Sequence, residues 1–184
     1  MTEAVSMRIA RYVSAVFVIC LLAGSLVAFA TADDKLQSRP GTTTTIILTR
    51  HAERTEVTKV LTEKGHQRAR DLVGAVAGLQ VAAIYSPDLE RNLDTVRPLA
   101  EHLGIEISVQ PANSTPLVND IVADMLQRHV GKTVLWVGNV SNLRAMYLRL
   151  GGDGEGPIGY GDLFIVTVPD SGPTRIEKRH YGAS

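Results

Sequence analysis

Cysteine is almost missing from the chain, which has a single one, Cys20, among 184 residues. One cysteine cannot form an internal disulfide, and it excludes a cysteine-rich metal site. The chain also lacks an excess of charge, because 19 lysines and arginines balance 19 aspartates and glutamates. This balance excludes the basic footprint of a nucleic-acid-binding protein. With 45% hydrophobic residues the chain is too apolar to be disordered, and its length suits one domain.

Charged residues are also absent from residues 12–30, an apolar run that follows Arg8 and Arg11. Basic residues, an apolar run and small residues before a polar stretch are typical of a secretory signal peptide. We therefore predict that residues 1–32 direct export, to the periplasm or out of the cell. The run is also long enough to span a bilayer, so a retained membrane anchor is the alternative. Removal of the segment would take away Cys20 and leave a domain without cysteine.

Residues 33–42 are polar and contain Pro40-Gly41, which predicts a linker before a domain at residues 43–184. In that domain, apolar runs rich in β-branched residues alternate with segments whose apolar residues recur at helical spacing. Strands are expected at 44–49, 81–85, 105–109, 133–137, 163–168 and 174–178. Helices are expected at 62–78, at 86–104 with Ser86 as the N-cap, from 117 to before Gly131, and through 143–150. Such alternation predicts a three-layer α/β/α sandwich around a mostly parallel sheet.

Polar side chains follow three of the predicted strands at their carboxyl ends. His51 and Arg50 come after the first strand, Arg91 lies just beyond the second, and Asn139 follows the fourth. Ligands of such sheets bind beyond the carboxyl ends of the strands. Arginine forks and helix N-termini favour phosphate, and positive charge nearby keeps an imidazole neutral and nucleophilic. The pattern predicts an anion site that holds a reactive histidine.

Three of these segments resemble motifs of one family. Arg-His-Ala stands at residues 50–52, and Ser86 to Thr95 has the pattern Ser-x-x-x-x-Arg-x-x-x-Thr. Residues 134–142 resemble a strand that ends in Gly-His-Ser-Asn. Together they resemble the histidine phosphatase superfamily (phosphoglycerate mutase-like) over residues 43–181. The resemblance implies that superfamily's fold and chemistry on a phosphoryl group.

The resemblance also implies roles for individual residues. His51 would be the nucleophile that accepts the phosphoryl group. Arg50 and Arg91 would hold the phosphoryl oxygens, and Arg54 resembles an extra basic residue that some members place beside the pocket.

Two positions depart from the family pattern. Asn139 stands where the family has a second histidine, so this phosphate-binding position can donate a hydrogen bond but carries no charge. Loss of a preorganised donor typically lowers the rate by about 10²–10³-fold. No carboxylate matches the family's general acid. Glu53, close to His51 in the chain, is the candidate for that role, and Asp120 and Asp162 are more distant alternatives.

Two functions follow from these residues. The first is an exported phosphatase that hydrolyses phosphomonoesters through a phosphohistidine at His51, with activity reduced by Asn139. The second is a degenerate member that binds phosphorylated ligands without turnover. We expect no cofactor and no metal, a small phosphorylated substrate or phosphate as partner, no nucleic acid, and membrane contact only through residues 12–30 if they are retained.

Overall fold

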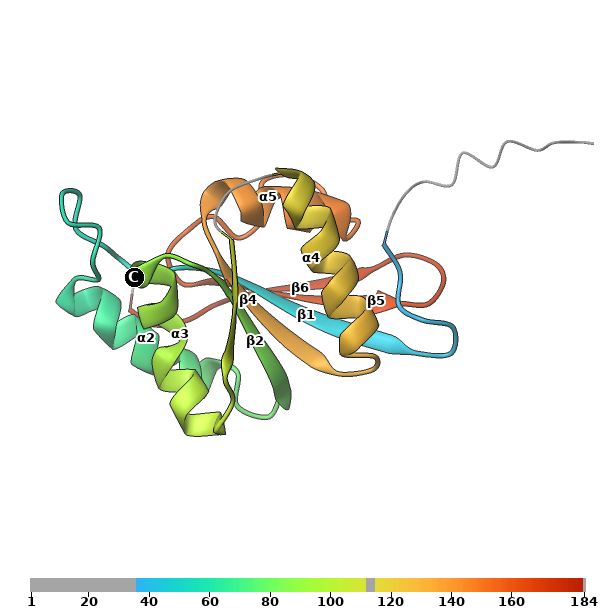
Figure 1. Ribbon diagram of the computed structural model, residues 1–184, viewed down its shortest axis with the longest axis horizontal. Coiled ribbons are helices and arrows are strands. Elements are labelled where there is room, and N and C mark those ends of the chain that lie inside the picture. The colour runs from blue at the N-terminus through green and yellow to red at the C-terminus, as the bar shows by residue number, and fades with distance from the viewer. Residues whose placement is uncertain (1–35, 112–114, 184) are drawn as a thin grey trace, which may run out of the picture. The chain divides into compact units, whose positions relative to one another are not determined.

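A computed structural model describes residues 36–111 and 115–183, and within them six strands form one sheet (Figure 1). The order across the sheet is β3-β2-β4-β1-β5-β6. The strands are β1 (Thr43–Arg50), β2 (Val81–Pro87), β3 (Ile107–Gln110), β4 (Thr133–Gly138), β5 (Asp162–Pro169) and β6 (Arg175–His180).

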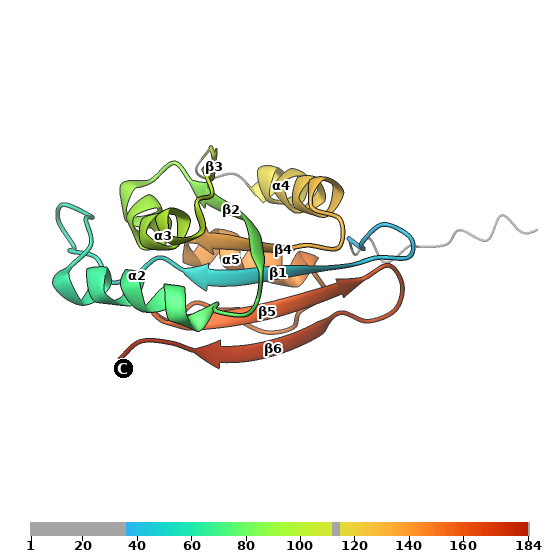
Figure 2. The ribbon, with the colours of Figure 1, turned by 90° about the horizontal axis from the view of Figure 1, so that it is seen from below.

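The sheet is mixed. β3, β2, β4 and β1 pair in parallel, whereas β5 runs antiparallel to β1 and β6 antiparallel to β5. Figure 2 shows β5 and β6 as a hairpin beside β1. The four parallel strands confirm the mostly parallel sheet that the alternating sequence predicted. They also direct the carboxyl ends of β1, β2 and β4 to the same edge, where polar residues follow each strand.

In the part of the chain that the structure describes, four helices cover the sheet, two on each face (Figure 1). They are α2 (Glu63–Ala75), α3 (Glu90–Leu103), α4 (Thr115–Arg128) and α5 (Val140–Arg149). Ile47 packs in one core with residues of α2 and α3, while Ile46 and Leu48 pack in the other with residues of α4 and α5. All three side chains are fully buried. The continuous apolar run of β1 is thus explained by helices on both faces, and the predicted three-layer sandwich is confirmed.

The ends of the helices follow local chemistry in two places and depart from the prediction in a third. The side chain of Thr62 caps α2 by accepting from the Gly65 N–H, and Gly104, with a φ of 65°, ends α3 in the left-handed conformation. The prediction that Ser86 caps α3 was wrong. Ser86 and the next residue remain in β2, because they pair with Val109 and Gln110 of the edge strand β3. α3 therefore begins only at Glu90.

The described part of the chain before β1 lies against β5. Ser38 is buried; its hydroxyl donates to the Val168 carbonyl and accepts from the Thr44 N–H. Residues 1–32, predicted to be a signal peptide or anchor, lie outside the described residues. Within the described residues, no helix is both long and apolar enough to cross a membrane.

Candidate active site

The first polar residues of the site follow β1 at the edge shared by the parallel strands. The register of β1 and β4 places Arg50 opposite Gly138, and the next N–H, that of His51, donates to the Gly138 carbonyl at 3.0 Å. His51 and Asn139 therefore leave neighbouring strands at the same level. The structure thus brings together two positions that lie 88 residues apart in the sequence.

Arg91 reaches this pair from the first turn of α3. Its Nη2 donates to Oδ1 of Asn139 at 3.1 Å. Burial and the positive charges of Arg54 and Arg50 lower the pKa of Arg91, which indicates that the three guanidinium groups are close together. Like charges gathered in this way repel each other, and an anion between them relieves that repulsion.

His51 is 3% exposed, and its Nδ1 lies 2.8 Å from the Ala52 carbonyl oxygen. A carbonyl only accepts, so Nδ1 carries the proton and Nε2 keeps its lone pair. The pKa of His51 is lowered to about 4, chiefly by burial and then by the charges of Arg50, Arg91 and Arg54. The hydrogen bond to Ala52 offsets only part of this effect. At neutral pH the ring is therefore an uncharged nucleophile surrounded by positive charge.

Arg50 is held by the loop that precedes β5. Its Nη1 donates to the Ile158 carbonyl at 2.8 Å, and the ring of Tyr160 lies 4.1 Å from its Cζ. The Nε of Arg50 and that of Arg91 are buried without a hydrogen-bond partner. A buried N–H of a charged group that has no acceptor is costly. Both donors therefore favour an anion at this edge of the sheet.

Arg54 stands at the base of a short hairpin and makes its contacts there. Its backbone forms an isolated antiparallel β-bridge with Leu61. Its side-chain Nη1 donates to the Thr55 carbonyl at 3.0 Å and lies 3.4 Å from Oε2 of Glu56. Its charge acts on both His51 and Arg91. Arg54 is therefore close enough to contribute positive potential to the anion site, although its own hydrogen bonds lie on the hairpin.

Glu53, the candidate acid, is turned away to another partner. Both carboxylate oxygens accept from Arg68, with Oε2 2.9 Å from Nε and Oε1 2.7 Å from Nη2. Burial raises the pKa of Glu53, but the hydrogen bonds from Arg68 and from its own backbone, together with the charges of Arg68 and Lys64, outweigh burial, and the net shift is downward. The carboxylate is thus ionised at neutral pH and has no proton to donate. Arg68 also donates to the Tyr181 and Ala183 carbonyls. Through Arg68, Glu53 therefore links the chain next to His51 to the C-terminal segment.

Two residues contribute that sequence reasoning did not assign. Thr95 is buried; its hydroxyl donates to the Arg91 carbonyl at 2.7 Å and accepts from the Ala52 N–H at 2.9 Å. It therefore joins α3 to the residue after the nucleophile, and its place in the arginine motif was the available signal. Tyr160 was missed entirely, and its only signal was an aromatic residue in a glycine-rich segment.

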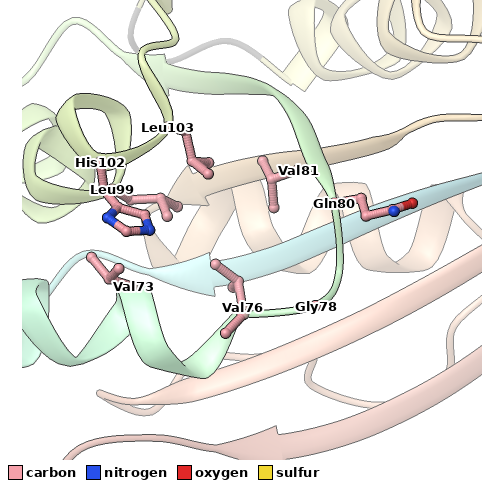
Figure 3. Close-up of a pocket in the computed structure, with 9 residues that line it drawn as sticks. Val73, Val76, Gly78, Gln80, Val81, Leu99, His102 and Leu103 are labelled. Carbon is pink, nitrogen blue, oxygen red and sulfur yellow. The ribbon is translucent and has the colours of Figure 1, made fainter.

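A cavity of about 290 Å³ lies elsewhere (Figure 3). It is lined by the end of α2, the start of β2 and the end of α3, mainly by aliphatic side chains such as Val76, Val81 and Leu99. The start of β2 is the opposite end of the strand from the one that leads to Arg91. Within residues 36–111 and 115–183, no three histidine, cysteine or carboxylate side chains gather as a metal site.

Comparison with known proteins agrees with this geometry. Residues 46–112 match the sequence model of the histidine phosphatase superfamily (branch 1). The protein histidine phosphatase SixA, solved with tungstate, superposes with a TM-score of 0.64 at 15% identity, covering 74% of this chain and 96% of SixA. The chain has the histidine phosphatase fold. The resemblance seen in the motifs is thereby confirmed.

Other histidine phosphatase folds superpose in the same way. YhfR of Bacillus stearothermophilus is 22% identical with a TM-score of 0.58, covering 72% of this chain and 95% of YhfR. A mycobacterial glucosyl-3-phosphoglycerate phosphatase is 15% identical with a TM-score of 0.58, covering 76% of this chain and 99% of its own. No curated protein matches the chain significantly. The family match includes Arg50, His51 and Arg91 but ends before Asn139.

Proposed function

We propose that the protein hydrolyses phosphomonoesters through a phosphohistidine at His51. The observation that carries this proposal is a buried, neutral imidazole whose Nε2 is free, with three arginines acting on it. Two of these, Arg50 and Arg91, keep a buried Nε–H without an acceptor. A phosphoryl group supplies the acceptors and the negative charge that this arrangement lacks.

The reaction takes place in two steps. First, the Nε2 lone pair of His51 forms a bond to phosphorus while the bond from phosphorus to the leaving oxygen breaks. Arg50 and Arg91 hold the other oxygens and stabilise their charge. A water molecule then attacks phosphorus, the bond to nitrogen breaks, and inorganic phosphate leaves while Nε2 regains its lone pair.

Asn139 sets the level of activity. Its Oδ1 accepts from Arg91, so it orients that guanidinium and leaves its amide N–H groups as neutral donors for the phosphoryl oxygens. A neutral donor stabilises transferred charge less than an imidazolium does. This residue also favours the second candidate, a protein that binds phosphorylated ligands without turnover. We rank hydrolysis first because a neutral His51 beside Arg50 and Arg91 supports a nucleophile with two donors for the phosphoryl oxygens.

The substrate class is proposed from the solved neighbours. They include the glucosyl-3-phosphoglycerate phosphatase and a phosphoserine phosphatase from Entamoeba histolytica in complex with 3-phosphoglyceric acid. These support a small phosphorylated substrate.

We also propose export, on the strength of the apolar run at residues 12–30. Mass spectrometry of the mature N-terminus tests this, and a chain that starts at Asp33 is expected.

Turnover of an aryl phosphate tests the enzyme hypothesis. His51→Ala is expected to abolish phosphate release, whereas His66→Ala, which removes an exposed histidine of α2, leaves it unchanged. Equal turnover in wild type and His51→Ala would reject catalysis by His51. If wild type releases no phosphate but inorganic phosphate raises its melting temperature, the protein is a binder instead, because a ligand of the native state stabilises it.

A further inference from the structure

The structure leaves one part of the proposed reaction without a residue. When the bond from phosphorus to the leaving oxygen breaks, an alkoxide leaving group needs a proton. Glu53 is ionised and bonded to Arg68 on both oxygens, so it cannot supply one. Asp162 accepts from the Gly159 N–H at 2.7 Å and faces His180 at 3.7 Å, which commits its carboxylate to the base of the loop before β5.

Tyr160 lies two residues before Asp162 in this loop, and its ring faces His51. Its ring packs edge-on to His51, with 5.9 Å between ring centroids, and stacks on Arg50 at 4.1 Å. The side chain is half-buried. Among the residues described, Tyr160 is thus the aromatic side chain in contact with both His51 and an arginine of the anion site.

The hydroxyl of Tyr160 has the hydrogen-bonding arrangement of a proton donor. Its oxygen accepts from Nη2 of Arg50 at 3.4 Å, and no described group accepts its own proton. A negative charge on this oxygen would also raise the pKa of Arg91, so both arginines of the site are placed to stabilise a phenolate. A phenolic hydroxyl donates as well as accepts, so this group can give its proton to a leaving oxygen placed against it.

The backbone around Tyr160 is fixed to the strand that carries the nucleophile. The Thr49 hydroxyl of β1 donates to the Asp162 carbonyl at 2.8 Å, and the Tyr181 N–H donates to the Gly161 carbonyl at 2.9 Å. The Ile158 carbonyl is bonded to Arg50 itself. These bonds on both sides hold Tyr160 in place relative to His51, which a group that transfers a proton requires.

We propose that Tyr160 is the general acid that protonates the leaving oxygen in the hydrolysis proposed above. As Nε2 of His51 bonds to phosphorus, the electron pair of the broken bond goes to the leaving oxygen, which takes the phenolic proton. The phenolate that remains is stabilised by Arg50 and Arg91. In the second step it takes a proton from the attacking water, which restores the phenol. This role rests on the proposed phosphatase function.

Leaving groups of different basicity test the proposal. Tyr160→Phe keeps the ring against His51 and Arg50 and removes only the hydroxyl. For an alkyl phosphate, whose alkoxide must be protonated, we expect kcat/KM to fall by about 10²–10⁴-fold. For p-nitrophenyl phosphate, whose leaving group departs as a stable anion, we expect no change in kcat/KM, because this ratio reports the first step and not the later attack of water. Tyr147→Phe removes another hydroxyl, at a buried tyrosine of α5, and serves as the control with no expected loss on either substrate.

The outcomes separate this proposal from the function on which it rests. Equal losses on both substrates in Tyr160→Phe would overturn the acid role and make Tyr160 a positioning residue, and no loss on either would remove it from the reaction. Both results leave hydrolysis by His51 standing if His51→Ala is inactive. Turnover that survives in His51→Ala would instead reject the phosphatase mechanism, and the proton donor with it. Thermal melting of each variant shows whether it is folded.

Discussion

The low pKa of His51 makes the stability of the protein depend on pH in a way that can be calculated. The pKa is about 4 in the native state, against about 6.5 for a solvated histidine. As the pH falls from 7.5 to 4.5, the unfolded chain gains a proton at this residue while most native molecules do not. Since the unfolded state then binds more protons, the native state loses stability as the pH falls.

The size of the effect follows from the two pKa values. Between pH 7.5 and 4.5 this single residue is expected to lower the free energy of unfolding by about 2.5 kcal/mol. Other groups also titrate in this range, so the comparison is with His51→Gln, which lacks the proton site. Urea denaturation can be followed by the fluorescence of Trp136, the one tryptophan, which is buried. Wild type should lose about 2.5 kcal/mol more than His51→Gln.

The refuting result is equally specific. Equal losses in wild type and His51→Gln would mean that His51 has the same pKa in the native and the unfolded state. Burial and the neighbouring arginines would then not lower the pKa of His51, and the positive potential on which the proposed anion site rests would be missing.

Three further predictions concern Asn139 and two residues that contact Glu53. Asn139→His is expected to raise kcat on an aryl phosphate by about 10²-fold, measured by phosphate release, and an unchanged kcat would show that this position does not limit transfer. Arg68→Leu removes the buried guanidinium from the Glu53 carboxylate, which is 15% exposed and keeps Lys64 at 3.8 Å, and should cost about 1–3 kcal/mol in urea denaturation, whereas an unchanged free energy of unfolding would contradict a stabilising pair. Gly65→Ala places a methyl group against the Glu53 carbonyl oxygen and should lower the melting temperature, while Gly74→Ala, which meets nothing within 4 Å, should not.

Much of the fold could be predicted from the sequence because its signals are local. The apolar run of β1 reflects burial by helices on both faces, and Thr62 and Gly104 mark helix ends through their own side chain or backbone. The start of α3 was predicted too early because Ser86 has the chemistry of a helix cap. Pairing of β2 with β3 decided its conformation, and a contact between strands is not visible in a local pattern.

For the site, the sequence predicted that His51, Arg50 and Arg91 lie at one edge of the sheet, because ligands bind beyond the carboxyl ends of parallel strands. The structure has all three residues at that edge. They could not show that Glu53 faces Arg68, because that pairing depends on how α2 packs beside β1. Tyr160 lies 109 residues from His51 in the sequence and belongs to no recognised motif. Only the fold of the loop before β5 brings its ring to Arg50.

The proposal that His51 carries the phosphoryl group is tested most directly by trapping it. The enzyme is mixed with an aryl phosphate, quenched in alkali, and its peptides are analysed by mass spectrometry. A phosphoryl group on the peptide that contains His51, absent from His51→Ala, is the predicted result. Steady release of phosphate with no phosphorylated peptide in wild type, or with undiminished release in His51→Ala, would contradict it.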